Sequence, residues 1–449
     1  MRPEDSFLSL YQEHASSVQA SCSDLLNKGR AEGYAVFERN GFPQATLEEY
    51  RNCDLKEVLS YDYGLNINRF KIPFNPHDLF CCDVPNLSTR LYYVVNDIFY
   101  KDSKNASLPD GVLCGSLNAF TQSHPELLEP YLNKLASDST DGMVGLNNTF
   151  VQDGFVLYVP EGVHISKPIQ LIQVFHGDID LMSNRRILVV IEKNASAQLL
   201  VCDHTMSVKR CLSNQVAELF VGEDASLDYY ELEMHETFTT RIANTFVRQD
   251  ANSKLLLHGI VLKNGLTRNN YKVTLAGEHA EAKLSGVALG EKDHLIDNHL
   301  FIDHAVPRCT SHELYKYVLD DASRGIFSGQ ILVRKDAQKT SAYQSNKNLC
   351  SSREARMFTK PQLVIYADDV KCSHGTATGQ IDEKALFYMR TRGISESEAR
   401  LLLKFAFTAD VIDEIRLEPL KERMRSLIEK RFRGELAQCA GCAVTSKKN

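Results

Sequence analysis

The chain has 449 residues, with 51 Lys and Arg against 58 Asp and Glu, for a formal charge of −7. This length predicts two or three domains, and the acidic balance argues against binding nucleic acid or an anionic membrane. The first residues, MRPEDSFLSL, do not resemble a signal peptide, and no apolar run approaches the ~18 residues of a membrane span. We therefore expect a cytoplasmic protein whose cysteines are mostly reduced.

Residues 1–94 are typical of a mainly helical region. Between Asp5 and Asn27 the apolar residues fall at spacings of three and four, as on one face of a helix. The helical texture continues to Phe37 and is broken at Asn40-Gly41-Phe42-Pro43. We expect this region to form a unit separate from the rest of the chain.

Residues 95–376 predict a β-rich core. Short β-branched and aromatic runs alternate with Gly, Asn and Asp from about Leu113 to Tyr366. A polar residue followed by alanine recurs before such runs, and the successive alanines are 30, 26, 29, 42 and 15 residues apart: Ala195, Ala225, Ala251, Ala280, Ala322 and Ala337. The polar residue permits a turn, and the small alanine fits a tight corner. The repeat favours a stacked β-solenoid, with a β-sandwich as the alternative.

Residues 377–449 predict helices again. Asp382 can cap a helix that ends before Gly393, and the sequence SESE from Ser395 is a capping box that opens a second helix. Pro419 can begin a third helix. The second helix carries an apolar stripe, which either packs inside this chain or docks a partner.

Familiar catalytic motifs are missing from the sequence. It contains no P-loop, no G-x-S-x-G, no H-E-x-x-H and no dinucleotide-binding fingerprint, which weakens the hydrolase, kinase and dehydrogenase interpretations. His294, His299 and His304 recur at intervals of five, so neighbours would fall on opposite faces of a strand. His294 and His304 would then lie ~33 Å apart, too far to share one metal. The Cys439-Ala-Gly-Cys442 pair is a weak metal or redox signal because no second pair accompanies it.

The stretch YADDVKCSHGTATGQ places a cysteine and a histidine two positions apart. On a strand, Cys372 and His374 share one face with their Cα atoms ~7 Å apart. A thiolate and an imidazole there could bind one iron or zinc ion, with the missing ligands supplied from elsewhere in the chain or from another subunit. Alternatively, Cys372 packs inside the core and His374 hydrogen-bonds at its end.

Residues Lys339–Arg400 resemble the SufD branch of the SufB/SufD family, scaffold subunits of the SUF machinery for iron–sulfur cluster assembly. The residues that carry the resemblance are Asn348-Leu349, Lys360-Pro361, the run YADDVKCSHG (Tyr366–Gly375), Leu386-Phe387-Tyr388 and Arg392-Gly393-Ile394. His304-x-x-Pro307-x-x-x-Ser311 is similar to a signature of both branches, and the Glu-His-Glu pattern of SufB-like chains does not occur in the equivalent stretch.

The resemblance implies a mainly β fold, a right-handed parallel β-helix flanked by N- and C-terminal helical regions. It implies a non-catalytic scaffold subunit that pairs with a SufB-like subunit through the β-helix, while a SufC-like ABC ATPase hydrolyses ATP. The ATPase is expected on the C-terminal helices, at a stripe formed by Leu402, Phe405, Ala406, Phe407, Ala409 and Ile412.

By the same resemblance, His374 lies at the interface between subunits and is a metal ligand during formation of the nascent cluster, with Cys372 as a second candidate. The cluster would be transient and shared with the partner, and no cofactor is expected in the isolated chain. A β-helix carbohydrate-active enzyme and a solitary structural homodimer remain the alternatives, and the isolated chain could form such a homodimer.

Overall fold

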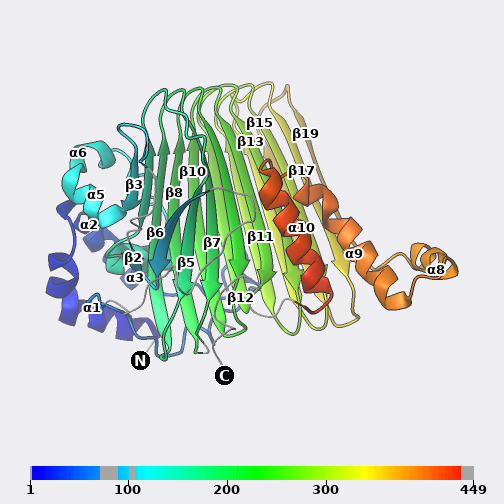
Figure 1. Ribbon diagram of the computed structural model, residues 1–449. Helices are drawn as coiled ribbons and strands as arrows, with labels where there is room; N and C mark the ends of the chain where they lie inside the picture. The colour runs from blue at the N-terminus through cyan, green and yellow to red at the C-terminus, as the bar shows by residue number, and fades with distance from the viewer. Residues whose placement is uncertain (1–2, 71–88, 101–106, 208, 436–449) are drawn as a thin grey trace.

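A parallel β-solenoid forms the centre of the molecule (Figure 1). The computed structural model describes the chain except for residues 1–2, 71–88, 101–106, 208 and 436–449. Ten strands form one sheet, in the order β19-β17-β15-β13-β11-β9-β7-β5-β1-β2, and nine form the other, in the order β18-β16-β14-β12-β10-β8-β6-β4-β3. Consecutive strands from β4 to β19 alternate between the two sheets, so every coil of the solenoid adds one strand to each sheet. The predicted solenoid is thereby confirmed.

The strands lengthen after the first coils and then keep a nearly constant length. Those of the ten-stranded sheet are β1 (Arg90–Val95), β2 (Ile98–Tyr100), β5 (Ile169–Phe175), β7 (Ser196–Thr205), β9 (Ser226–Met234), β11 (Lys254–Lys263), β13 (Glu281–Gly290), β15 (Thr310–Leu319), β17 (Ser341–Cys350) and β19 (Lys371–Gly379). Those of the nine-stranded sheet are β3 (Leu113–Ser116), β4 (Phe155–Val159), β6 (Leu181–Ile191), β8 (Cys211–Val221), β10 (Thr239–Gln249), β12 (Leu266–Leu275), β14 (Leu295–His304), β16 (Arg324–Val333) and β18 (Arg356–Ile365).

The corners between strands follow the predicted repeat closely. Left-handed backbone, with φ between 50° and 63°, occurs at Asn194, Asp224, Asn252, His279 and Asp321. A small buried residue follows at each of these corners: Ala195, Ala225, Ser253, Ala280 and Ser323. At two corners a serine therefore takes the place predicted for Ala251 and Ala322, and its hydroxyl donates a hydrogen bond to the carbonyl three residues earlier.

Apolar side chains from alternate positions of both sheets fill the inside of the solenoid. One continuous cluster runs from Tyr92, on the first coil, to Ala355, beside the last. On β11, for example, Leu255 and Leu257 point inward and are almost completely buried. Each such side chain contributes roughly 1.5–3 kcal/mol through removal from water, so the coils are joined by stacking as well as by strand pairing.

Short helices cover the first coils (Figure 1). They are α1 (Pro3–Ala20), α2 (Asp24–Asn27), α3 (Arg30–Asn40), α5 (Leu117–Ser123), α6 (Pro125–Leu128) and α7 (Gly142–Phe150). The 3-10 helix η1 (Glu48–Tyr50) lies farther along the nine-stranded sheet, where the Glu49 carbonyl accepts a hydrogen bond from Arg268 on β12. Helices α5 to α7 lie within the segment 95–376 that the sequence assigned to the β core. Helix α7 packs closely on α3, since a Cβ atom added at Gly145 would lie 2.9 Å from the Gly33 carbonyl oxygen. The proposed boundaries at 94 and 376 stay predictions.

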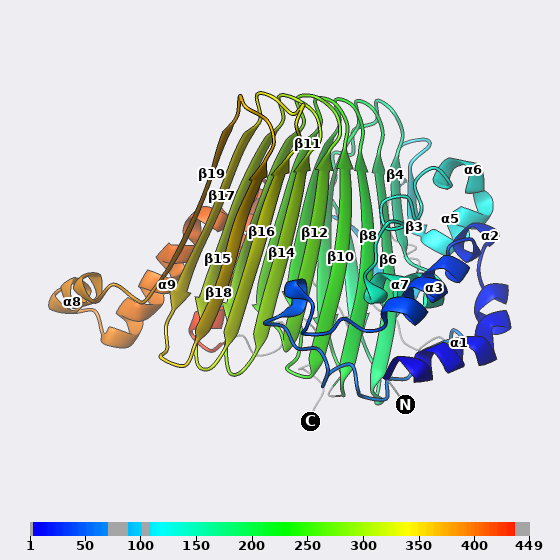
Figure 2. The ribbon, with the colours of Figure 1, turned by 180° about the vertical axis from the view of Figure 1, so that it is seen from behind.

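Among the described residues, three helices follow the last coil: α8 (Glu383–Thr391), α9 (Glu396–Ile412) and α10 (Glu418–Phe432). The Asp382 carboxylate caps α8, Gly393 follows it with φ of 86°, and the Ser395 hydroxyl caps α9, as the sequence predicts. Helices α9 and α10 lie on the outer face of the ten-stranded sheet, whereas α8 extends away from the solenoid (Figures 1 and 2). Within the ranges that the structure describes, no helix combines the length and the apolar character that crossing a bilayer requires.

Candidate functional site

The last coil leaves the C-terminal end of the solenoid open (Figure 2). Strand β19 pairs only with β17 among the described strands, and β18 only with β16. The outer edges of both strands therefore present backbone N–H and C=O groups to their surroundings. Such an edge can pair with another chain.

His374 lies on this terminal strand and is exposed. Its Cα pairs with that of Gln344 on β17, whose side chain is buried inside the solenoid. His374 thus belongs to a row of inward-facing residues, and it is accessible because no further coil covers it. No hydrogen bond or ion pair joins the imidazole to another described residue, so both ring nitrogens are open to a ligand.

Cys372 shares the row of His374, as the alternation along a strand predicts, but it is half-buried. It packs against a small apolar cluster that includes Ala342 and Ala367. Burial raises the pKa of the Cys372 thiol, only partly offset by the backbone N–H of Ala342. Cys372 therefore presents a thiol more readily than a thiolate. No group of three or more His, Cys, Asp or Glu in the described part of the chain is arranged to hold a metal ion.

Large apolar side chains are exposed around the open end. Tyr343, Phe358, Ile365 and Tyr366, all from the last two coils, are 38–64% exposed. Exposed apolar groups beside an edge strand are typical of an interface with another protein. We call these four residues, together with strand β19, the terminal face.

Behind His374, the row continues inward through Gln344 to Glu313 on β15. Gln344 Nε2 donates a hydrogen bond of 2.7 Å to Glu313 Oε2. Burial raises the pKa of the Glu313 carboxyl to about 8. Neither Gln344 nor Glu313 was predicted from the sequence, although their spacings of 31 and 30 residues along this row are the length of one coil.

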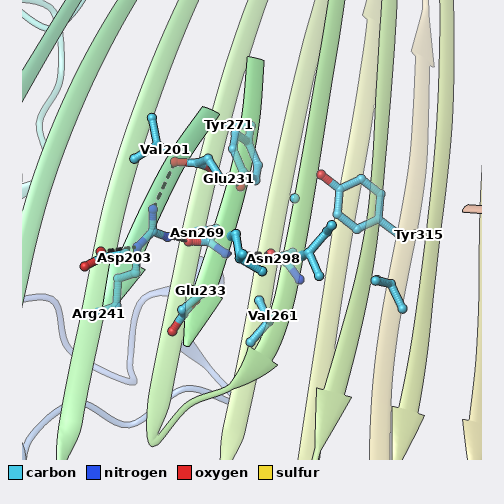
Figure 3. Close-up of a pocket in the computed structure, with 14 residues that line it drawn as sticks. Val201, Asp203, Glu231, Glu233, Arg241, Val261, Asn269, Tyr271, Asn298 and Tyr315 are labelled. Carbon is cyan, nitrogen blue, oxygen red and sulfur yellow. Dashed lines mark hydrogen bonds and ion pairs between the residues drawn. The ribbon is translucent and has the colours of Figure 1, made fainter. Parts of the chain in front are cut away.

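A second polar cluster lies deep inside the solenoid (Figure 3). Arg241 donates hydrogen bonds to Glu231 at 3.0 Å and to Asp203 at 3.3 Å, beside a cavity of about 20 Å³. Burial by itself would raise the pKa of Asp203, but Arg185, His235 and Arg241 hold it below its usual range. These carboxylates are paired with arginines inside the solenoid, an arrangement that suits a structural role.

The three recurring histidines are separated, as predicted. His294 and His304 are buried, and His304 Nε2 lies 2.9 Å from Ser311 Oγ. His299 Nε2 instead lies 2.9 Å from Asp297 Oδ1 on the outer face of the nine-stranded sheet. The Cys439–Cys442 pair lies outside the described residues.

The stripe proposed for partner docking on α9 is only partly accessible. Leu402 and Ala406 are exposed, while Phe405, Phe407 and Ala409 are half-buried. Ile412 is 1% exposed and packs in the core between α9 and the sheet, so its assignment to the docking surface was wrong. The neighbouring helix α8 adds two strongly exposed rings that the prediction omitted, Phe387 and Tyr388.

Comparison with known proteins matches almost the whole chain to two domains. Residues 174–407 match the SUF system FeS cluster assembly SufBD core domain, and residues 1–171 match the SufBD protein N-terminal region. Both segments contain helices as well as strands of the solenoid. The core match includes the terminal face and α9 as far as Phe407.

Named relatives extend over most of the chain. An iron–sulfur cluster assembly SufBD family protein of Synechocystis is 28% identical over 430 residues, covering 92% of this chain and 94% of the relative. The iron–sulfur cluster assembly protein SufD of Escherichia coli is 29% identical over 295 residues, covering 64% and 69%. SufD of Bacillus subtilis is 26% identical over 355 residues, covering 78% and 81%.

Proposed function

Because the chain belongs to the SufBD family of the SUF system for iron–sulfur cluster assembly, we propose that it is a SufD-type scaffold subunit without catalytic activity of its own. It pairs with a SufB-like subunit through the terminal face, and the nascent cluster forms between the two chains. The observation that carries this proposal is the exposed His374 on the edge strand at the open end of the solenoid.

The terminal face suits a second solenoid of similar design. Its strand edges can continue the sheets into the partner, and Tyr343, Phe358, Ile365 and Tyr366 supply apolar area to bury. A partner that adds a coil would enclose the row that contains His374. The same geometry accepts a second copy of this chain, so a homodimer of the isolated chain is an expected competitor.

The imidazole of His374 is a suitable ligand for a cluster that must later leave. Neutral imidazole binds iron through one ring nitrogen and carries no negative charge. Thiolates and acids of the partner supply the remaining ligands in this proposal. Cys372 packs in an apolar cluster and acts mainly as a structural residue of the coil.

A SufC-like ABC ATPase docks on helices α8 and α9 in this proposal. Leu402 and Ala406 lie one turn apart on the exposed face of α9, and Phe387 and Tyr388 are exposed on α8. Together they offer an apolar surface to a partner, while ATP hydrolysis is left to that partner. Movement of α9 would reach the solenoid through its contacts with β13 and β15.

The test is to replace His374 by alanine in the complex with SufB-like and SufC-like partners and to measure the yield of reconstituted cluster. We expect a loss of at least tenfold with an intact complex. Ser373→Ala, on the opposite face of the same strand, is the matched control and should leave the yield unchanged. An unchanged yield in His374→Ala would remove His374 from the cluster site.

A further inference from the structure

Three polar residues form one straight row at the open end of the ten-stranded sheet. Glu313 on β15 is in register with Gln344 on β17, which is in register with His374 on β19. Parallel neighbours lie ~4.8 Å apart, so side chains at paired positions stack on each other. Glu313 and Gln344 are buried and His374 is exposed, so the row leads from the interior to the surface.

Among the described residues, the Gln344 amide forms a hydrogen bond through its nitrogen and none through its oxygen. Its nitrogen donates to Glu313, which directs the amide oxygen away from that carboxyl. This oxygen is buried and has no hydrogen-bond partner among the described residues. A buried acceptor without a donor is unfavourable, and His374 carries a donor on the next strand.

Gly329 provides the space for this amide. A Cβ atom added at Gly329 would lie 2.8 Å from Gln344 Cδ and closer still to Nε2. The glycine therefore lets the Gln344 side chain lie across the lumen against the backbone of β16. Any larger residue would displace the amide, which is the movable end of a flexible side chain.

A neutral imidazole has one N–H donor and one nitrogen lone pair. When the N–H donates a hydrogen bond to a fixed acceptor, the tautomer of the imidazole is set. The lone pair on the other ring nitrogen then points away from that acceptor. Metal-binding histidines are commonly held in this way by a carbonyl or carboxylate oxygen. In the row that ends at His374, the buried amide oxygen of Gln344 is an unused acceptor at the position paired with His374, and no hydrogen bond joins the two side chains in the structure.

We propose that Gln344 is the positioning residue of His374, with its amide oxygen accepting the imidazole N–H while Glu313 holds the amide nitrogen. The row then orients the second imidazole nitrogen toward the open end of the solenoid. Burial raises the pKa of Glu313 and so favours its neutral carboxyl, which leaves the Gln344 amide beside an uncharged group. The consequence for a bound cluster rests on the proposed function, whereas the proposed hydrogen bond involves residues of this chain alone.

The hydrogen bond can be observed in the full chain without partners or iron. In protein with ¹⁵N-labelled histidine, a hydrogen-bonded ring N–H exchanges slowly enough to give a ¹H–¹⁵N correlation peak. We expect one peak that disappears in His374→Ala, which assigns it, and also disappears in Gln344→Leu. Gln344→Glu retains an acceptor and should retain the peak. Persistence of the peak in Gln344→Leu, or its absence from the unmodified chain, would overturn the proposal.

Two controls separate loss of the hydrogen bond from loss of the fold. The buried His258, whose Nδ1 lies 2.6 Å from Ser285 Oγ, should keep its ring signal in every variant. Gly329→Ala should displace the amide and remove the His374 peak without altering Gln344 itself. Gly375→Ala adds the same methyl group where no atom lies within 4 Å, and should leave the peak in place.

The link to cluster assembly is measured separately in the complete complex. Gln344→Leu should shorten the lifetime of the reconstituted cluster by roughly tenfold or more, as loss of a residue that orients a metal-binding histidine does, and Gln344→Glu should restore most of it. If His374→Ala leaves the cluster unchanged, the proposed function fails while the ring N–H peak still reports the hydrogen bond. If Gln344→Leu removes the peak and the cluster is unaffected, the positioning role is refuted.

Discussion

Lys316 on β15 and Asp410 on α9 form an ion pair of 2.6 Å in which the lysine is 6% exposed and the aspartate 52% exposed. The Lys316 ammonium also donates to the Phe407 carbonyl at 2.7 Å and lies 4.6 Å from the centroid of the Phe407 ring. A nearly buried cation thus joins helix α9 to the sheet. Since β15 pairs with β17, and β17 with β19, the contact lies two strands from His374.

Replacing Asp410 by asparagine should destabilise the chain. The change leaves the buried Lys316 ammonium without its counter-ion, although the Phe407 carbonyl still accepts one hydrogen bond. We expect a loss of about 1–2 kcal/mol in the free energy of unfolding, discounted for the exposed carboxylate. Asp413→Asn breaks an ion pair with Arg425 in which both side chains are exposed, and should cost less than ~0.5 kcal/mol. Equal losses in urea unfolding would contradict this ranking.

Ile365→Asp should weaken pairing with a SufB-like subunit. The side chain is 38% exposed on the terminal face, so a charge there would be buried against the partner while the isolated chain tolerates it. We expect at least a tenfold rise in the dissociation constant, ~1.4 kcal/mol, with little change in melting temperature. Ile179→Asp is the matched control, because Ile179 is 62% exposed in the turn before β6, away from the terminal face. A similar effect of both changes on co-purification would place the interface elsewhere.

The features that sequence predicted well depend on neighbouring residues. The caps at Asp382 and Ser395 use backbone N–H groups within three residues, so their chemistry is readable along the chain. The corners at Asn194 and His279 likewise need only a residue that tolerates left-handed backbone before a small one. The exposure of His374 was also predicted, but the prediction came from the family resemblance and not from the residue type.

The features that sequence missed depend on knowing which coil lies beside which. Gln344 lies beside His374 only because a coil is about 30 residues long at this point, whereas the alanine repeat varied from 15 to 42 residues. An apolar stripe on a helix shows that one face is buried, without showing what covers it. That is why Ile412 was assigned to a partner although it packs on the chain's own sheet.

Glu313 should make stability depend on pH. Burial raises its folded-state pKa to about 8 from a reference value of 4.5, so the folded chain binds this proton more tightly than the unfolded chain. The stabilisation is therefore complete below pH ~4.5, falls as pH rises, and reaches its minimum above pH ~8. The slope is at most ~1.4 kcal/mol per pH unit.

Glu313→Gln should remove this contribution, because glutamine does not titrate. Urea unfolding at a series of pH values from 6 to 9 would measure the free energy of unfolding of both chains. Glu281→Gln changes an exposed glutamate on β13 and should keep the slope of the unmodified chain. If the slope survives in Glu313→Gln, another group is responsible for it.

The left-handed backbone at His279 should make the stability of the chain depend on which residue occupies this corner. This residue has φ of 63°, where a side chain with a Cβ atom is strained by roughly 1–2 kcal/mol relative to glycine. His279→Gly should therefore raise the free energy of unfolding by about 0.5 kcal/mol, after the extra entropy of an unfolded glycine is counted. His279→Val should lower it by about 1 kcal/mol or more, since a β-branched residue is least tolerant of this conformation.

The control places the same valine on extended backbone. Lys254→Val changes an exposed residue at the start of β11, where β-branched side chains are favoured, and should alter the free energy of unfolding by less than ~0.5 kcal/mol. The measurement is the urea midpoint of each variant at constant slope. If the free energy of unfolding rises for glycine and falls for valine at position 279, backbone conformation determines the stability of this corner. Two losses of equal size would show that the stability depends on the imidazole instead.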